Sequence, residues 1–151
     1  MFAERLRRSL AEGTSVLVGT VDADGVPACC RGVALIPKDD DTVTVYLPVA
    51  TAQETVANVA TTRRLAVCIS HPIDHTTTQL KGVTRGVRIA GEHERELVTR
   101  SLEKFADILD EIGLPRRITR SVTHWPAFAI DMSVEETFDQ TPGPKAGNPI
   151  A

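Results

Sequence analysis

Short apolar segments joined by turns constrain the fold of this chain most. Six segments are rich in β-branched and apolar residues and have the length or the alternation of a strand. They span residues 14–21, 26–36, 42–47, 65–69, 77–90 and 128–134. Asp22-Ala23-Asp24-Gly25 joins the first two, and Asp-Gly tolerates the positive φ angles of a hairpin turn. Six strands with hairpin connections predict a largely antiparallel β-barrel.

Helical segments accompany the strands rather than alternating with them. Phe2, Leu6 and Leu10 recur in steps of four, which predicts an amphipathic helix over residues 2–12. The longest helix is predicted over residues 93–112, because apolar residues trace one face before the sequence Gly-Leu-Pro. A doubly wound parallel sheet is therefore not expected. The fold class we predict is mainly β, a barrel with flanking helices.

Length and composition place the chain among ordinary globular proteins. Its 151 residues predict a single domain over 1–151, with residues 140–151 as an irregular tail rich in Pro and Gly. With 42% hydrophobic and 25% charged residues, disorder and coiled coil are not expected as the dominant class. A net charge of −3 with scattered basic residues argues against a nucleic-acid partner.

The same features predict where the protein works. No apolar run reaches about 18 residues, so no membrane span is expected. The first residues lack the apolar core of a signal peptide. Three cysteines without metal-like spacing fit a reducing compartment. We therefore expect a cytoplasmic protein without a membrane or nucleic-acid partner.

Polar residues inside two apolar strands form the first candidate site. Alternation places Arg31 on the same face of its strand as Val33. It also places Gln79 and Lys81 on the same face as Val83. If the apolar positions point inward, these cations do too, and a buried cation needs an anionic partner or a ligand. The alternative is that Arg31 and Lys81 reach water at a strand edge or pair with carboxylates.

The start of the short helix after the third strand is a second candidate. Thr51-Ala52-Gln53-Glu54 has the pattern of a capping box, in which Thr51 and Glu54 each bond the other's backbone amide. The free amides of such a helix start also attract anions. Plain capping is the alternative, and the charge of Glu54 argues against an anion there.

The remaining reactive side chains carry weaker signals. His71 and His75 share a loop, but their spacing matches no strong metal pattern, so no metal site is predicted. Cys29 and Cys30 are adjacent on a strand and face opposite sides, so a disulfide between them is not expected. Trp125 either fills the core or offers a stacking face to a planar ligand.

Four segments together resemble a known family. They are GTVDADGVPACCRGVAL, VTVYLPVATAQETVANVATTRRLAVCI, TTTQLKGVTRGV and SVEETFDQTPGPKAG. In order and spacing they resemble the pyridoxamine 5′-phosphate oxidase-like, FMN-binding split-barrel superfamily, over nearly the whole chain. The resemblance implies a six-stranded antiparallel split barrel that forms a homodimer, with two flavin sites at the subunit interface.

The resemblance also implies which residues contact the ring of the cofactor. Arg31 matches an Arg that family members place near the flavin ring and phosphate. Val33 matches a position next to the isoalloxazine ring. Gln79 matches a Gln that approaches the flavin, and Lys81 lies beside it on the same face.

The resemblance also implies a phosphate-binding turn, and there the sequence departs from the family. Tyr46 and Leu47 match the strand that leads into this turn, and Thr51 matches the helix start that follows. Family members often carry a basic group there, whereas this chain has Ala52-Gln53-Glu54. Charge-assisted bonds to phosphate contribute roughly 1.5–3 kcal/mol each, so a turn without a basic group is expected to bind the flavin phosphate more weakly.

The function that follows is an FMN-binding flavoprotein, an oxidoreductase whose substrate the sequence does not define. No residue stands out as a general acid or base, and the tail differs from the Arg-bearing ending of the true oxidase, so vitamin B6 synthesis is not predicted. A non-catalytic module that binds or senses a small molecule is the alternative. A protein of the same superfamily that binds deazaflavin or haem is a further alternative.

Overall fold

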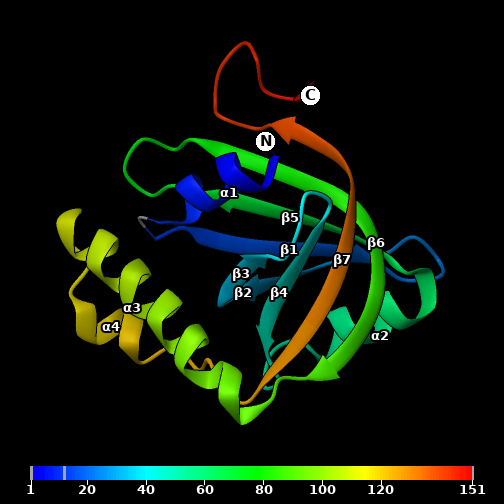
Figure 1. The fold of residues 1–151 in the computed structure, drawn as a ribbon, viewed down its shortest axis with the longest axis horizontal. Helices are drawn as coiled ribbons and strands as arrows, with labels where there is room; N and C mark the ends of the chain where they lie inside the picture. The colour runs from blue at the N-terminus through cyan, green and yellow to red at the C-terminus, as the bar shows by residue number, and fades with distance from the viewer. Residues whose placement is uncertain (1, 12, 151) are drawn as a thin grey trace.

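The strands predicted from alternation lie in one antiparallel sheet (Figure 1). The structure is a computed structural model that describes residues 2–11 and 13–150. Its elements in chain order are α1 (Phe2–Ala11), β1 (Ser15–Val21), β2 (Pro27–Gly32), β3 (Ala34–Pro37), β4 (Thr42–Pro48), α2 (Gln53–Thr62), β5 (Arg64–Ser70), β6 (Thr77–Ile89), a 3₁₀ turn η1 (Glu92–Glu94), α3 (Arg95–Glu111), α4 (Arg116–Arg120), β7 (Ala127–Asp139) and β8 (Asn148–Pro149).

The sheet curls into a half-barrel. Its strand order is β2-β1-β5-β6-β7-β4-β3, with β8 added beside β7. The two ends of this order are consecutive in the chain, because only Val33 separates β2 from β3. The Val33 amide donates to the Tyr46 carbonyl of β4 over 2.9 Å, which brings the end of β2 to the opposite edge. The predicted class, an antiparallel barrel with flanking helices, is confirmed.

The number of strands differs from the prediction of six. The segment predicted as one strand over residues 26–36 divides at Val33 into β2 and β3. The tail, predicted to be irregular, contributes the two-residue strand β8, which pairs with Phe138 and Asp139. The described chain therefore has eight strands. Alternation of apolar residues predicts neither the bend at Val33 nor the short strand β8.

Glycines interrupt β6 as predicted. The register between β6 and β7 shifts between Lys81 and Gly82 and again between Thr84 and Gly86. A Cβ atom at Gly82 would lie 1.9 Å from the Ser133 carbonyl oxygen, so only glycine permits this approach of the two strands. These irregularities accompany the long curve of β6 and β7 around the barrel (Figure 1).

Helix α2 begins one residue later than the capping box requires. Its N-cap is Ala52, and no side chain caps it. The Thr51 hydroxyl lies 3.9 Å from the Cys30 sulfur instead of bonding Glu54. The predicted capping box is therefore wrong, because Thr51 still belongs to the turn that follows β4.

Helix α4 was not predicted from the sequence. No helix within residues 2–11 and 13–150 has the length and apolar character of a membrane span.

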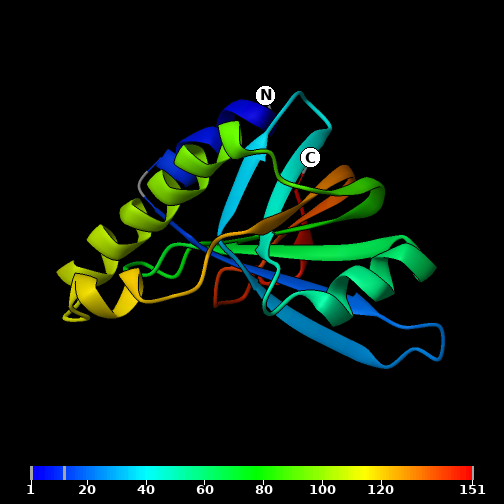
Figure 2. The same ribbon diagram turned by 90° about the horizontal axis from the view of Figure 1, so that it is seen from below.

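Two apolar clusters hold the elements together. The main core fills the barrel with side chains from its strands and from α1 and α2. A second cluster lies outside the barrel, where Val98 of α3 packs on Ala34, Tyr46 and Ala129. Figure 2 shows α1 and α3 on one side of the barrel and α2 on another. Helix α3 therefore covers the outer surface of β3, β4 and β7, and its Phe105 also reaches Arg31 at the end of β2.

Candidate functional site

The outer surface of β2, β1, β5 and β6 is the part of the sheet that α3 does not cover, and we call it the open face. One row of directly paired residues crosses it and continues onto β7. In order across the strands the row is Arg31, Leu17, Cys68, Gln79 and Phe138. The neighbouring row contains Lys81. Arg31, Gln79 and Lys81, which the sequence predicted as cofactor contacts, therefore lie on one face.

That face is the outer one, so the expectation of inward-pointing cations is wrong. Arg31 is exposed, while Cys30 and Gly32 beside it are buried. The prediction assumed one continuous strand, but the bend at Val33 changes the phase of alternation before Leu35 enters the core.

In β6 the inward positions are those next to the predicted ones. Leu80, Gly82 and Thr84 are buried, and Lys81 is exposed. Val83, whose apolar side chain suggested an inward face, is only partly buried. Lys81 needs no buried anion in this arrangement, because its ammonium group reaches solvent.

Gln79 is held on β6, at one side of the open face, by two polar contacts. Its Nε2 donates to the Cys68 sulfur over 3.4 Å, and its Oε1 accepts from Gln140 Nε2 over 3.3 Å. The Lys81 ammonium lies 4.7 Å from the centroid of the Phe138 ring, within the range of a cation–π contact. A side-chain amide and a cation are thus positioned side by side on a partly apolar surface.

Arg31 lies at the other end of the row. It is three strands from Gln79, or about 14 Å at the usual strand spacing. Its Nη1 donates to the Ser15 hydroxyl over 3.2 Å, and its guanidinium carbon lies 5.8 Å from the centroid of the Phe105 ring of α3. None of the ion pairs found among the described residues includes Arg31. This cation is therefore available to an anionic group.

Four of the predicted contacts lie away from the open face. Val33 and Tyr46 belong to the cluster beneath α3. The Leu47 side chain is fully buried in the main core, so it contacts no ligand in this conformation. Thr51 is exposed at the start of α2, on a different part of the surface. Arg31, Gln79 and Lys81 therefore share one face of the sheet, and Tyr46, Leu47 and Thr51 lie elsewhere. Val33 is off this face but lines a pocket together with Arg31.

Tyr46 takes part in a partly buried polar network instead, in which the Arg88 side chain is 44% exposed. Its hydroxyl donates to Glu94 Oε1 over 2.7 Å, and Arg88 donates to both Glu94 oxygens over 2.6 and 2.7 Å. Hydrogen bonding by Arg88 is the main reason that the pKa of Glu94 falls to about 2. Burial and the bond to Glu94 raise the pKa of Tyr46 above its usual range. This network fastens η1 to β4 and β6 and has a structural role.

The helix start at Thr51 offers no cation. Gln53 Nε2 donates to the Val49 carbonyl over 2.9 Å, and Glu54 is exposed beside it. Burial raises the pKa of the neighbouring Cys30 thiol, so that thiol is a poor nucleophile. The start of α2 therefore has no basic side chain among Thr51, Gln53 and Glu54 to hold a phosphate, as the sequence indicated.

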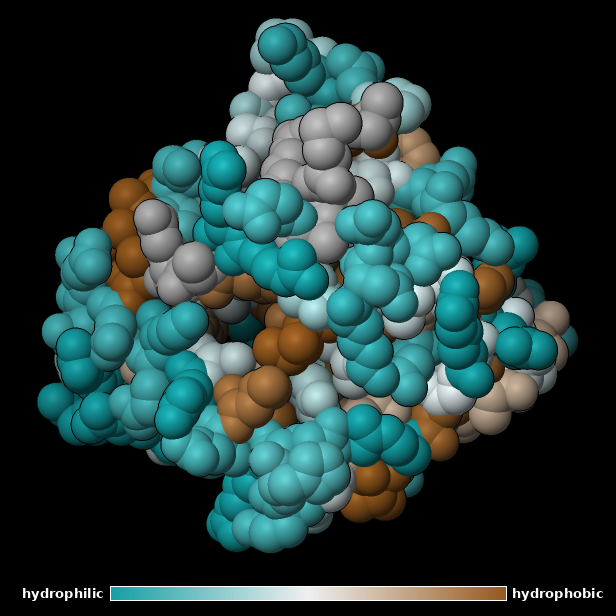
Figure 3. Space-filling view, viewed as in Figure 1, coloured by the Kyte–Doolittle hydropathy of each residue, from teal (hydrophilic) through white to brown (hydrophobic). Residues whose placement is uncertain are grey.

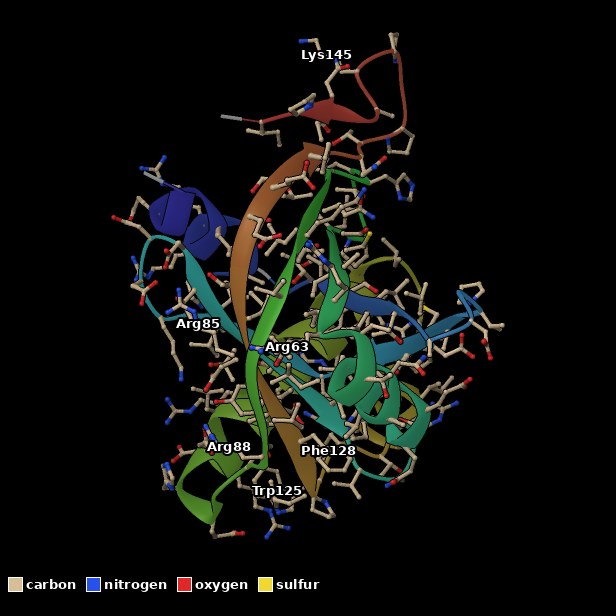
Figure 4. The ribbon with its side chains drawn as sticks, turned by 90° about the vertical axis from the view of Figure 1, so that its right-hand side faces the viewer. Arg63, Arg85, Arg88, Trp125, Phe128 and Lys145 are labelled. Atoms are coloured by element: carbon tan, nitrogen blue, oxygen red, sulfur yellow. The ribbon has the colours of Figure 1, made fainter. Side chains whose placement is uncertain are left out.

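The remaining candidates do not add a catalytic group. Within the described part of the chain no cluster of three metal-ligating side chains occurs. The Cys29 and Cys30 thiols are free, as predicted. Trp125 packs against the cluster beneath α3, and Figure 4 places it with Arg88 at the end of the β6–β7 pair opposite Lys145. Its packing supports the core-filling interpretation.

Sequence reasoning missed Leu17, Cys68 and Phe138 as parts of this surface. Leu17 is 39% exposed although it lies in the middle of β1. A signal was present in the sequence, because the outward positions Leu17, Gly19 and Val21 of β1 carry no polar side chain. A strand that is apolar on both faces predicts a covering partner on each side.

Comparisons with known proteins concern the fold. No family model matches the chain, and no curated protein matches it. Among solved structures, HupZ of Group A Streptococcus is 18% identical, with 97% of this chain and 100% of that chain covered and a TM-score of 0.58. A candidate pyridoxamine 5′-phosphate oxidase from Lactobacillus delbrueckii is 16% identical, with coverages of 88% and 90% and a TM-score of 0.56. An FMN-binding protein from Syntrophomonas wolfei is 15% identical, with coverages of 91% and 84% and a TM-score of 0.55.

Proposed function

Because this chain has the split-barrel fold of pyridoxamine 5′-phosphate oxidase-like and FMN-binding proteins, we propose that it is a cytoplasmic, homodimeric flavoprotein of oxidoreductase type. FMN binds on the open face, at the seam between two copies. The observation that carries this proposal is the gathering of Arg31, Gln79 and Lys81 on one uncovered face of the sheet.

The open face has the character of an interface. Leu17 and Val21 are 39% and 38% exposed on β1, in a part of a sheet that would ordinarily be covered. Gly19 and Ala66 lie opposite each other on β1 and β5, so the surface around them is flat. A flat apolar surface with polar groups at its rim suits both a second copy and a planar ring.

The polar groups at the rim fit different parts of a flavin. Gln79 carries a side-chain amide, which can donate to and accept from the polar edge of the ring. Arg31 offers an unpaired guanidinium to an anionic group, and the Lys81 ammonium adds positive charge. When bound, the flavin supplies the hydride-transfer chemistry, while the protein orients it and excludes water.

A non-catalytic module that binds a small molecule is the second candidate. Thr51, Gln53 and Glu54 are exposed at the start of α2 and include no cation. A phosphate at this helix start would meet the carboxylate of Glu54, which weakens its binding. This observation favours a ligand without a phosphate at that position.

A titration with FMN, followed by absorption and flavin fluorescence, tests the proposal. We expect saturable binding by the unchanged protein and a loss of roughly tenfold or more in Arg31→Ala, because a charge-assisted bond is removed. Arg100→Ala, which removes an exposed arginine on α3, is the matched control and should bind as the unchanged protein does.

The colour of the freshly purified protein separates the alternatives. A yellow protein that a nicotinamide nucleotide bleaches supports the oxidoreductase. A colourless protein that does not respond to FMN supports the non-catalytic module, and a deazaflavin spectrum or a sharp haem band identifies the other two possibilities. Equal FMN affinity of Arg31→Ala and Arg100→Ala would place the flavin elsewhere.

A further inference from the structure

A separate pocket lies between the barrel and the helices α3 and α4. Its volume is about 370 Å³, near the lower end of the range of roughly 300–1,000 Å³ that small-molecule sites occupy. Leu102, Phe105 and Leu109 of α3 form one wall, and Val16 and Val33 form the opposite one. Figure 3 shows the surface hollowed here, with hydrophobic residues around the recess.

The position of α3 against the barrel shapes this pocket. Gly13, at φ +90°, leads from the region after α1 into β1. A Cβ atom on Gly13 would lie 2.5 Å from the Lys104 carbonyl oxygen of α3, so the two backbones are in direct contact there. The pocket begins next to this contact, at Thr14, and is therefore bounded by elements whose separation the backbone fixes.

One wall carries a buried hydroxyl without a partner. Thr119 of α4 lines the pocket and is 2% exposed. Its Oγ1 has no hydrogen-bond partner among the described residues. The Pro115 carbonyl, which a helical threonine in this place could use, accepts the Ile118 amide instead. An unpaired buried hydroxyl destabilises a fold, but the Thr119 oxygen has almost no accessible surface, so it lies within the wall and does not face the interior of the pocket.

The only charged side chain among the described residues that line the pocket is Arg31. It approaches from β2 with its guanidinium above Phe105. No carboxylate pairs with it among the described residues, as shown above. The pocket thus combines an apolar interior and one cation.

We propose that this pocket is a second ligand site, which binds a small amphipathic anion. The apolar body of the ligand packs against Leu102, Phe105 and Leu109, and its anionic group pairs with Arg31. The site needs no flavin, and Arg31 lies on the border between it and the open face, where the five donors of a guanidinium can serve both.

Calorimetric titration with octanoate, 1-octanol and octylammonium tests the charge preference. These probes share an apolar chain and differ in the head group. We expect octanoate to bind at one site per chain, at least tenfold more tightly than 1-octanol, with octylammonium the weakest. Absence of octanoate binding, or equal affinity for octanoate and 1-octanol, would overturn the proposal.

Two variants test the location. Val122→Trp places a large side chain in the lining and should abolish octanoate binding. Arg31→Gln should reduce it at least tenfold. Unchanged octanoate affinity in either variant contradicts the site as described.

Stability and flavin binding give independent readouts. Without ligand, Thr119→Val should raise the melting temperature by roughly 2–4 °C, because it removes an unpaired buried hydroxyl. A lower melting temperature would mean that the hydroxyl has a structural partner. FMN titration separates the two proposals, because Val122→Trp should bind FMN as the unchanged protein does while it no longer binds octanoate. In the unchanged protein, octanoate binding without FMN binding defeats the flavin proposal alone, and FMN binding without octanoate binding defeats this one alone.

Discussion

The outer surface of the barrel has two halves that differ in what covers them. On β3, β4 and β7 the outward residues are buried beneath α3, with Ala34, Ala127 and Ala129 each at most 2% exposed. On β1 and β2 the outward residues Leu17 and Arg31 remain exposed, although the strands are as regular. The first half is therefore completed within the chain, whereas this chain leaves Leu17 and Arg31 on the second half exposed, where we propose a second copy.

Polar contacts also stabilise the covered half. Glu94 accepts hydrogen bonds from Tyr46, Arg88 and the Gly91 amide, which ties η1 and the start of α3 to the sheet. On the open face, Gln79 and Lys81 contact only their neighbours on adjacent strands. The covered half should therefore govern stability, and the open face should govern binding.

The largest expected effect is on the covered half. Glu94→Ala removes the acceptor of a partly buried network and leaves Tyr46 and Arg88 unpaired, so we expect a loss of about 2–4 kcal/mol in the free energy of unfolding, measured with denaturant. Glu92→Ala is the control, because its side chain is 73% exposed in its pair with Arg95, and it should change stability by less than about 0.5 kcal/mol. Similar losses in both variants would show that the network does not fasten η1.

A pH dependence of nearly the same size follows from the same carboxyl group. The pKa of Glu94 is lowered from 4.5 to about 2 in the folded chain. Its contribution is fully present above pH 4.5 and is lost as the pH falls from 4.5 toward 2, with a total of up to roughly 3 kcal/mol.

The check is denaturant unfolding across this pH range. Glu94→Gln should flatten the decline in stability between pH 4.5 and 2, relative to the unchanged protein. A decline of the same steepness in Glu94→Gln would assign the acid sensitivity to other groups.

A smaller effect is expected when the open face is made polar at its centre. Leu17→Asp introduces a charge where the proposal places the seam, so dimer affinity should fall roughly a hundredfold, or about 3 kcal/mol. Folding should persist, because Leu17 is already 39% exposed.

Light scattering during size exclusion measures this effect. Ile112→Asp is the control, since Ile112 is 53% exposed at the end of α3, away from the open face. A dimer that persists in Leu17→Asp but dissociates in Ile112→Asp would move the interface to the helices.

The smallest expected effect concerns the cation at the rim. Lys81→Ala should weaken FMN binding about twofold to fivefold, since an exposed ammonium above an aromatic ring contributes little. Fluorescence titration at low and high salt measures it, and the difference between the two proteins should shrink as salt rises. A loss larger than that in Arg31→Ala would reverse the roles assigned to these two cations.

The sequence predicted the architecture well because alternation and turn residues report it directly. The bends of β6 at Gly82 and Gly86 and the hairpin at Gly25 are where glycine predicted them. The direction of the site residues was not predictable in the same way. The bend at Val33 inverts the phase of one strand, and Val83 is apolar although it faces outward.

The pocket lay beyond sequence reasoning for a different reason. The β1–β2 hairpin brings Val16 close to Arg31, but Thr119 lies far along the chain, and only the packing of α3 and α4 brings it to them. Nothing in the local pattern around Thr119 distinguishes its hydroxyl from that of any other helical threonine. Its missing partner is a property of the tertiary structure.

Native mass spectrometry of the freshly purified protein tests the central claim most directly, namely that the open face is covered by a second copy with a flavin between them. We predict a mass equal to two chains and two FMN molecules, and a single chain without flavin for Leu17→Asp. A single chain in the unchanged protein, or a dimer without flavin that Leu17→Asp leaves intact, would contradict the account.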